Sequence, residues 1–134
     1  MKRSVRILIL GLSIVMLLGI GSFFAFSHIE QRLLNLENLP VMHEIPRSLA
    51  DGTYEGTYST FPIKVRVQVH VVNKQMQAIE LLEHRNGQGS AASAILDDVV
   101  AKQSLTVDTI SGATYSSIVM LKAVEDALNK AGEV

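Results

Sequence analysis

A short stretch near the C-terminus, Ser111–Ser117, combines residue types that favour the binding of a phosphate. It packs hydroxyl side chains, one glycine and one alanine directly before a predicted helix. A helix start offers backbone N–H groups and the positive end of the helix dipole, and both attract a phosphate. Gly112 and Ala113 add almost no bulk there. A plainer interpretation stays open from these residues alone, because Ser111 or Thr114 could simply cap the helix, which is the commoner role.

Three predicted strands precede this stretch. Residues 63–72 alternate strictly between apolar and polar side chains, with valines on one face, and residues 76–83 continue after a turn at Asn73-Lys74. Residues 52–58 are aromatic and β-branched with two glycines, which suit a strand that bends or lets another group approach its backbone. The residues of 76–83 expected to face inward are Ile79 and Leu81.

Two helical patterns follow the strands, over residues 90–103 and 115–131. Each has one apolar stripe that needs a surface to cover, and the valine face of the hairpin supplies one. The predicted fold class is therefore α+β, a small antiparallel β-sheet packed on one face by two helices. One N-terminal transmembrane helix is expected to precede it.

That transmembrane helix is predicted from Ile7–Phe26, a run of 20 residues without a charge. At about 1.5 Å per residue the run reaches about 30 Å, the thickness of the hydrocarbon core of a bilayer. Lys2, Arg3 and Arg6 precede it, which predicts a cytoplasmic N-terminus and an extracytoplasmic C-terminal domain at the cell membrane. A cleaved signal peptide is the alternative, but its apolar core would be shorter, and only residues 25–27 offer a weak cleavage site.

The sequence is thus expected to have three parts. Residues 1–27 form the cytoplasmic tip and the transmembrane anchor. Residues 28–50 form a juxtamembrane stalk, whose helix Pro40 is expected to stop, and an extended linker bracketed by Pro40 and Pro46. Residues 51–134 form the folded domain.

Composition excludes several classes of function. The chain has no cysteine, so it has no disulfides, no thiolate metal site and no cysteine nucleophile. Its 12 basic and 13 acidic residues include no basic block, which argues against a nucleic-acid binder. The four histidines do not occur at metal-ligand spacing with a carboxylate, so no metal site is expected.

The sequence Asp108-Thr109-Ile110-Ser111-Gly112-Ala113-Thr114-Tyr115-Ser116 resembles the signature of the FMN-binding domain family. That family includes the flavin-carrying subunits of the sodium-pumping NADH:quinone reductase and of a related electron-transport complex. The resemblance extends in order over most of residues 51–134. It includes Asp51-Gly52-Thr53-Tyr54-Glu55-Gly56, Pro62-Ile63-Lys64-Val65 and Leu82-Glu83-His84.

The resemblance implies that a flavin transferase, using FAD and magnesium, esterifies FMN through its phosphate to the hydroxyl of Thr114. The implied cofactor-binding residues are Thr114, Ser111, Gly112, Ala113, Asp108, Ser116 and His84. No residue of the chain is expected to be catalytic. The implied function is a membrane-anchored electron carrier between a membrane donor and an extracytoplasmic acceptor, rather than a free-standing enzyme.

Other features leave alternatives open. Many relatives have a longer, proline-containing loop where this chain has residues 85–89, so contacts to the flavin ring are expected to differ. His70 is expected on a solvent-facing strand surface. The tyrosines could stack on a flavin or pack in the core; they are Tyr54, Tyr58 and Tyr115. The alternative function is a non-redox extracytoplasmic binding or structural module that binds FMN loosely or not at all.

Overall fold

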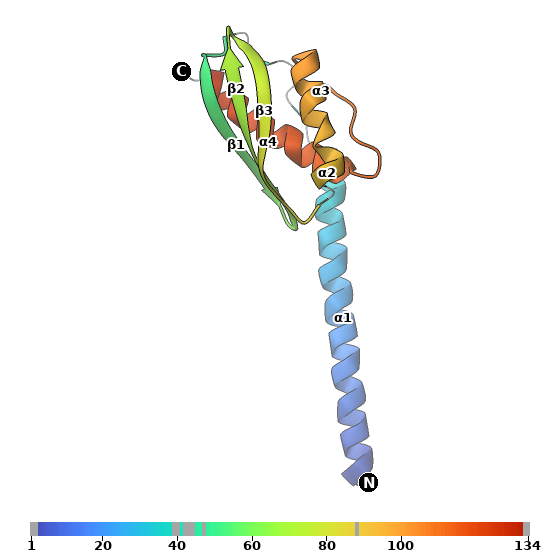
Figure 1. Ribbon diagram of the computed structural model, residues 1–134. Coiled ribbons are helices and arrows are strands. Elements are labelled where there is room, and N and C mark those ends of the chain that lie inside the picture. The colour runs from blue at the N-terminus through green and yellow to red at the C-terminus, as the bar shows by residue number, and fades with distance from the viewer. Residues whose placement is uncertain (1–2, 39–40, 42–44, 47, 88, 133–134) are drawn as a thin grey trace. The chain divides into compact units, whose positions relative to one another are not determined.

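The computed structural model describes residues 3–38, 41, 45–46, 48–87 and 89–132 (Figure 1). The chain divides into two units, residues 1–32 and residues 33–134. The first unit consists of most of helix α1, and the second contains the sheet and the remaining helices. Each unit is described by itself below.

Helix α1 (Arg3–Glu37) is long and apolar enough to cross a membrane. Its 32 residues from Val5 to Leu36 include a window with a mean hydropathy of 2.5. The hydroxyl groups of Ser13, Ser22 and Ser27 each donate a hydrogen bond to a carbonyl in the preceding turn. These serines therefore add little polarity to an otherwise apolar helix surface.

The second unit is built on an antiparallel sheet with the strand order β1–β2–β3. The strands are β1 (Gly52–Thr60), β2 (Ile63–Val72) and β3 (Gln75–Arg85). Asn73 and Lys74 join β2 to β3 with positive φ angles of 53° and 62°, which is the backbone of a type I′ hairpin turn. The predicted hairpin is confirmed, and β3 extends two residues beyond its predicted end.

One face of the sheet is buried beneath helices, as predicted. Helix α4 (Thr114–Gly132) packs on β1 and β2, whereas α3 (Ala94–Lys102) packs on β3 (Figure 1). The buried apolar side chains of the strands are those of Ile63, Val65, Val67, Val69, Val71 and Met76. The α+β class is thus confirmed, and the apolar face of β2 forms the floor of the core.

Gly56 is the point at which α4 approaches the sheet most tightly among the described glycines. A Cβ atom built on Gly56 would overlap the carbonyl oxygen of Ala123 and would lie 2.6 Å from the backbone nitrogen of Ala127. The backbone of α4 therefore occupies the space that a side chain would need. This explains one of the two strand glycines through close approach rather than through backbone flexibility.

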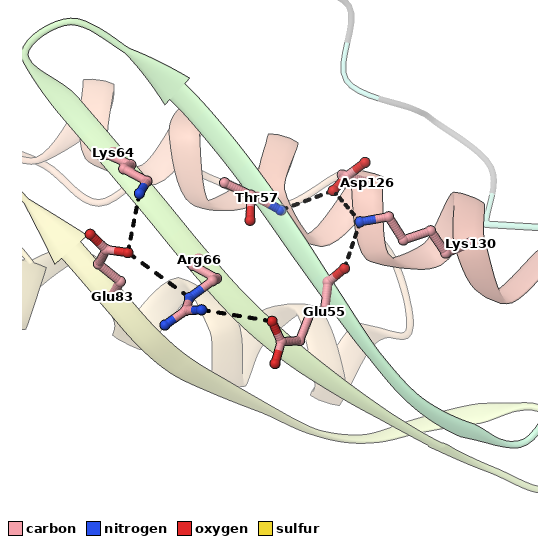
Figure 2. Close-up of polar contacts among 7 residues, drawn as sticks. All are labelled: Glu55, Thr57, Lys64, Arg66, Glu83, Asp126 and Lys130. Atoms are coloured by element: carbon pink, nitrogen blue, oxygen red, sulfur yellow. Dashed lines mark hydrogen bonds and ion pairs between the residues drawn. The ribbon is translucent and has the colours of Figure 1, made fainter.

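Side chains of α4 form hydrogen bonds with backbone groups along the outer edge of β1 (Figure 2). Asp126 accepts a hydrogen bond of 2.9 Å from the backbone N–H of Thr57, and Lys130 donates one of 2.8 Å to the carbonyl of Glu55. Lys130 also pairs with Asp126 at 2.9 Å. Burial alone would raise the pKa of Asp126, but its hydrogen bonds to Lys130 and Thr57 hold that pKa below the usual 3.8.

At the opposite edge of the sheet, the Gln103 side chain binds the backbone of Met76 on β3. Its Oε1 atom accepts a hydrogen bond of 3.0 Å from the Met76 N–H, and its Nε2 atom donates one of 2.7 Å to the Met76 carbonyl. Both edge strands thus have backbone groups that are satisfied by side chains from the helical layer. Such contacts hinder pairing with a further strand at these positions.

The structure differs from the predicted helix over residues 90–103. Two helices, α2 (Gly89–Ala92) and α3, occupy this region with a break at Ser93. The Ser93 hydroxyl donates to the carbonyl of Ser90, and the Ser93 carbonyl accepts from the N–H of Leu96. These shorter-range bonds replace the regular helical pattern at the break.

Part of the predicted stalk and linker contributes to the core of the second unit. Leu36 is 2% exposed and Leu49 is 4% exposed. The Ala50 N–H donates a hydrogen bond of 3.0 Å to the carbonyl of Ala131, near the end of α4. Pro40, which was expected to stop the helix, lies outside the described residues, and α1 ends at Glu37.

Candidate functional site

A tight turn carries the chain into α4. The Ala113 N–H donates a hydrogen bond of 2.9 Å to the carbonyl of Ile110, which closes a four-residue turn. Gly112 has a φ of +79° at the third position, as a type II turn requires. A side chain at this position would be strained, so the glycine is explained by its backbone conformation.

Ala113 occupies the N-cap position of α4. Its carbonyl accepts the first helical hydrogen bond, 2.9 Å from the backbone N–H of Ser117. Neither Ser111 nor Thr114 holds this position, so the interpretation of either residue as the N-cap is wrong. Alanine has no side-chain oxygen, and it cannot cap the N–H groups of the first turn as a serine would.

Ser117, which was not among the predicted site residues, fixes the turn against the helix. Its hydroxyl is fully buried, accepts a hydrogen bond of 3.1 Å from the Ile110 N–H and donates one of 2.9 Å to the Ala113 carbonyl. A single side chain thus holds both ends of the type II turn. The available signal was a small hydroxyl residue one helical turn after Ala113.

A hollow of about 160 Å³ opens at the start of α4. It is lined by Ile63, Gly87, Gly112, Ala113, Thr114, Tyr115 and Ser116. The structure therefore brings three other predicted site residues, Gly112, Ala113 and Ser116, together around the half-buried Thr114. Asp108 and Ser111, also predicted, are exposed and are not among the lining residues.

Two lining residues, Ile63 and Gly87, come from outside the motif and were not predicted. They lie far from Thr114 in sequence and reach the hollow because β2 begins there and β3 ends there. Tyr115, an aromatic candidate for contact with a flavin, lines the hollow and also packs against the core. Tyr54 and Tyr58 pack against the core without lining the hollow.

A β-bulge directs His84 toward the helical side of the sheet. Val67 pairs with Leu81, but Arg66 pairs with Glu83, so Leu82 is the extra residue in β3. His84 consequently lies opposite the buried Val65 and shares its face of the sheet. A regular strand that buries Leu81 would have placed His84 on the outer face.

His84 lies against the loop that borders the hollow. A Cβ atom built on Gly87 would overlap the Ser116 hydroxyl and would lie 2.9 Å from His84 Nε2. That nitrogen is buried and has no hydrogen-bond partner among the described residues. His84 thus contacts Gly87, which lines the hollow, but does not line the hollow itself. Burial lowers the pKa of His84 below the usual 6.5.

The lowered pKa predicts that stability falls in mild acid. The unfolded chain takes up a proton on His84 at a pH where the folded chain does not, so the stability contributed by neutral His84 is present above about pH 6.5 and is lost below it. We expect a His84→Asn variant to lose less stability than the wild type between about pH 7.5 and about pH 5.5. Urea unfolding midpoints measure this difference, and equal losses in the two proteins would contradict it.

His70 lies on the outer face of the sheet, as expected. Its Nδ1 atom is 3.1 Å from the Thr53 hydroxyl, and its Nε2 atom is 3.5 Å from Glu80 Oε1. The described part of the chain contains no group of three or more acidic or histidine side chains that could hold a metal ion. His70 is therefore assigned to cross-strand contacts.

Comparison with known proteins connects this geometry to one family. The sequence profile of the FMN-binding domain matches residues 58–129, which is more than half of the chain. A urocanate reductase from Eggerthella lenta is 36% identical over 82 residues, covering 59% of this chain. The chain spans only 14% of the length of that curated relative. The family match includes the end of β1, all of β2 and β3, the turn and the residues that line the hollow.

Proposed function

Because the chain belongs to the FMN-binding domain family, we propose that it is a membrane-anchored extracytoplasmic electron carrier with FMN esterified to Thr114. The observation that carries the proposal is the position of Thr114. Its side chain borders a hollow at the start of a 19-residue helix whose N-cap residue is alanine. A hydroxyl in this position can hold a phosphate beside the positive end of the helix dipole.

The residues present fit the phosphate of FMN. Gly112 and Ala113 leave space beside Thr114, and the first-turn N–H groups can donate to phosphate oxygens in place of a side-chain cap. Ser117 keeps the turn in the geometry that opens this space. The chain thus contributes a preformed phosphate-binding site beside Thr114 rather than an enclosed flavin pocket.

The attachment chemistry needs one nucleophile from this chain. In the proposed reaction with FAD, Thr114 Oγ1 forms a bond to the phosphorus of the FMN half, the bond from that phosphorus to AMP breaks, and the hydroxyl proton is released. A flavin transferase with magnesium supplies the remaining catalytic groups. Asp108 and Ser111 are exposed beside the turn, and we assign them to recognition by the transferase.

His84 and Ser116 support the same site from the other side of Gly87. The buried His84 Nε2 lacks a partner among the described residues, so it can take part in a hydrogen bond once a ligand or water reaches this loop. Ser116 is buried at the edge of the hollow. We assign both residues to positioning of the bound phosphate.

The proposed role is electron transfer. Bound FMN supplies one- and two-electron redox chemistry, whereas the protein supplies its position and surroundings. The name of the E. lenta relative denotes a reductase, which supports a redox role for this domain. The proposed partners are a redox donor in the membrane and an extracytoplasmic acceptor.

The test is expression of the full chain with and without a flavin transferase. We expect flavin fluorescence that survives denaturing electrophoresis only when the transferase is present. The mass of the peptide that contains Thr114 should then rise by one FMN less one water. Flavin that is lost on denaturation would instead support the non-redox or loosely binding alternative.

Cysteine labelling tests the proposed location. The chain has no cysteine, so Ser4→Cys and Asp97→Cys each introduce a single thiol. With a cytoplasmic N-terminus, a membrane-impermeant maleimide should label only the Asp97→Cys variant in intact cells. Both variants should react after permeabilisation. Labelling of Ser4→Cys alone in intact cells would show the reverse orientation. A released protein that lacks its N-terminal apolar segment would show cleavage.

A further inference from the structure

The hollow beside Thr114 is too small to contain all of FMN. Its volume is about 160 Å³, whereas pockets that enclose small organic ligands have volumes of about 300–1,000 Å³. It can take the phosphate and the first part of the ribityl chain. The isoalloxazine ring must therefore lie outside the hollow, against whatever surface its rim provides.

Of the aromatic side chains that the structure describes in the second unit, Phe61 is the one that is exposed. Tyr54, Tyr58 and Tyr115 pack against the core, but Phe61 is 62% exposed. Phe61 lies in the turn between β1 and β2. Its exposed ring offers an apolar surface on which another aromatic ring can stack.

The turn that carries Phe61 is connected to the rim of the hollow on two sides. Phe61 lies two residues before Ile63, which lines the hollow. Asn86 Nδ2 donates a hydrogen bond of 3.1 Å to the carbonyl of Pro62, and the next residue, Gly87, also lines the hollow. Phe61 thus lies on a short segment, held by this hydrogen bond, at the edge of the hollow beside Thr114.

Another exposed apolar residue, Val72, lies too far from the hollow to contact a flavin ring attached to Thr114. It is 47% exposed and ends the strand that Ile63 begins. The nine steps of extended chain from Ile63 to Val72 place them about 30 Å apart. Val72 therefore provides a matched control on the same strand.

We propose that Phe61 is the platform on which the isoalloxazine ring rests when FMN is attached to Thr114. This inference rests on the proposed function. Aromatic rings stack favourably on one another, and a ring held over Phe61 would have one face shielded from solvent. The other face would stay accessible to an electron donor or acceptor, as a carrier with a shallow site requires.

The test uses the full chain with covalently attached flavin and places tryptophan either at position 61 or at position 72. Tryptophan in contact with a flavin quenches its fluorescence by electron transfer. We expect Phe61→Trp to shorten the flavin fluorescence lifetime severalfold and Val72→Trp to leave it unchanged. Phe61→Ala should increase the quenching of the flavin by dissolved iodide, because it uncovers the shielded face.

The outcomes separate the two proposals. Attached flavin whose lifetime is the same in wild type, Phe61→Trp and Val72→Trp would overturn the platform and leave the attachment at Thr114 intact. A wild-type chain that acquires no flavin beside an active transferase would overturn the proposed function and the platform with it. Phe61 is exposed, so circular dichroism should show that each variant folds.

Discussion

Thr114→Ala is expected to abolish covalent flavin attachment completely, because the substitution removes the only atom proposed to form the phosphoester bond. The fold should remain. Thr114 is half-buried at the first position of α4, and the buried hydrogen bonds of the turn belong to Ser117. We expect a loss of stability of no more than about 1 kcal/mol. Intact mass and in-gel fluorescence of the denatured chain measure attachment, and circular dichroism measures folding.

Two variants show whether the loss is specific. Thr114→Ser keeps a hydroxyl at the same place and should retain attachment. Thr109→Ala removes a neighbouring hydroxyl that is exposed and does not line the hollow, so it should also retain attachment. Attachment that persists in Thr114→Ala would exclude Thr114 as the modified residue. Equal loss in Thr109→Ala would show that the effect is not specific to the Thr114 hydroxyl.

Gly56→Val is expected to destabilise the second unit by more than about 3 kcal/mol, beyond the usual cost of overpacking a core. The added atoms would overlap the Ala123 carbonyl and crowd Ala127, and both contacts are with parts of α4 that cannot rotate away. Total stabilities of small domains are about 5–15 kcal/mol, so a large part of the folded population is at risk. Urea unfolding of the full chain in detergent, followed by circular dichroism, measures the change.

The control is Ser59→Val on the same strand. Ser59 is exposed on the outer face, so valine there meets no helix and should have an effect within about 0.5 kcal/mol. Strand propensity by itself favours valine over glycine at both positions. Equal unfolding midpoints for Gly56→Val and the wild type would mean that α4 does not pack on β1 as the structure shows.

The local pattern of the sequence was sufficient for the main elements. The strict alternation over residues 63–72 corresponds to a strand with those bounds, and the predicted helix over 115–131 differs from α4 by one residue at each end. The turn at Asn73-Lys74 was also confirmed. These features depend on neighbouring residues, so a single sequence contains the information that decides them.

The details of the site depended on contacts between distant segments. The extra residue Leu82 in β3 turns His84 toward the helices. The alternation of apolar and polar residues in β2 does not predict this shift in the register of β3. Ile63 and Gly87 join the hollow only because two strand ends meet the start of α4. The break at Ser93, in contrast, rests on hydrogen bonds between residues three apart, which compete with a regular helix.

The sequence by itself determined the α+β fold, a long apolar N-terminal segment and a phosphate-favouring motif around Thr114, since side-chain period and residue type follow directly from the order of residues. Only the tertiary structure showed that Ala113 holds the N-cap position and that the Ser117 hydroxyl binds both ends of the turn. It also showed that the backbone of α4 packs directly on Gly56. The physical reason is that register, close approach and hydrogen-bond partners are properties of pairs of segments. Those pairs exist only once the chain has packed.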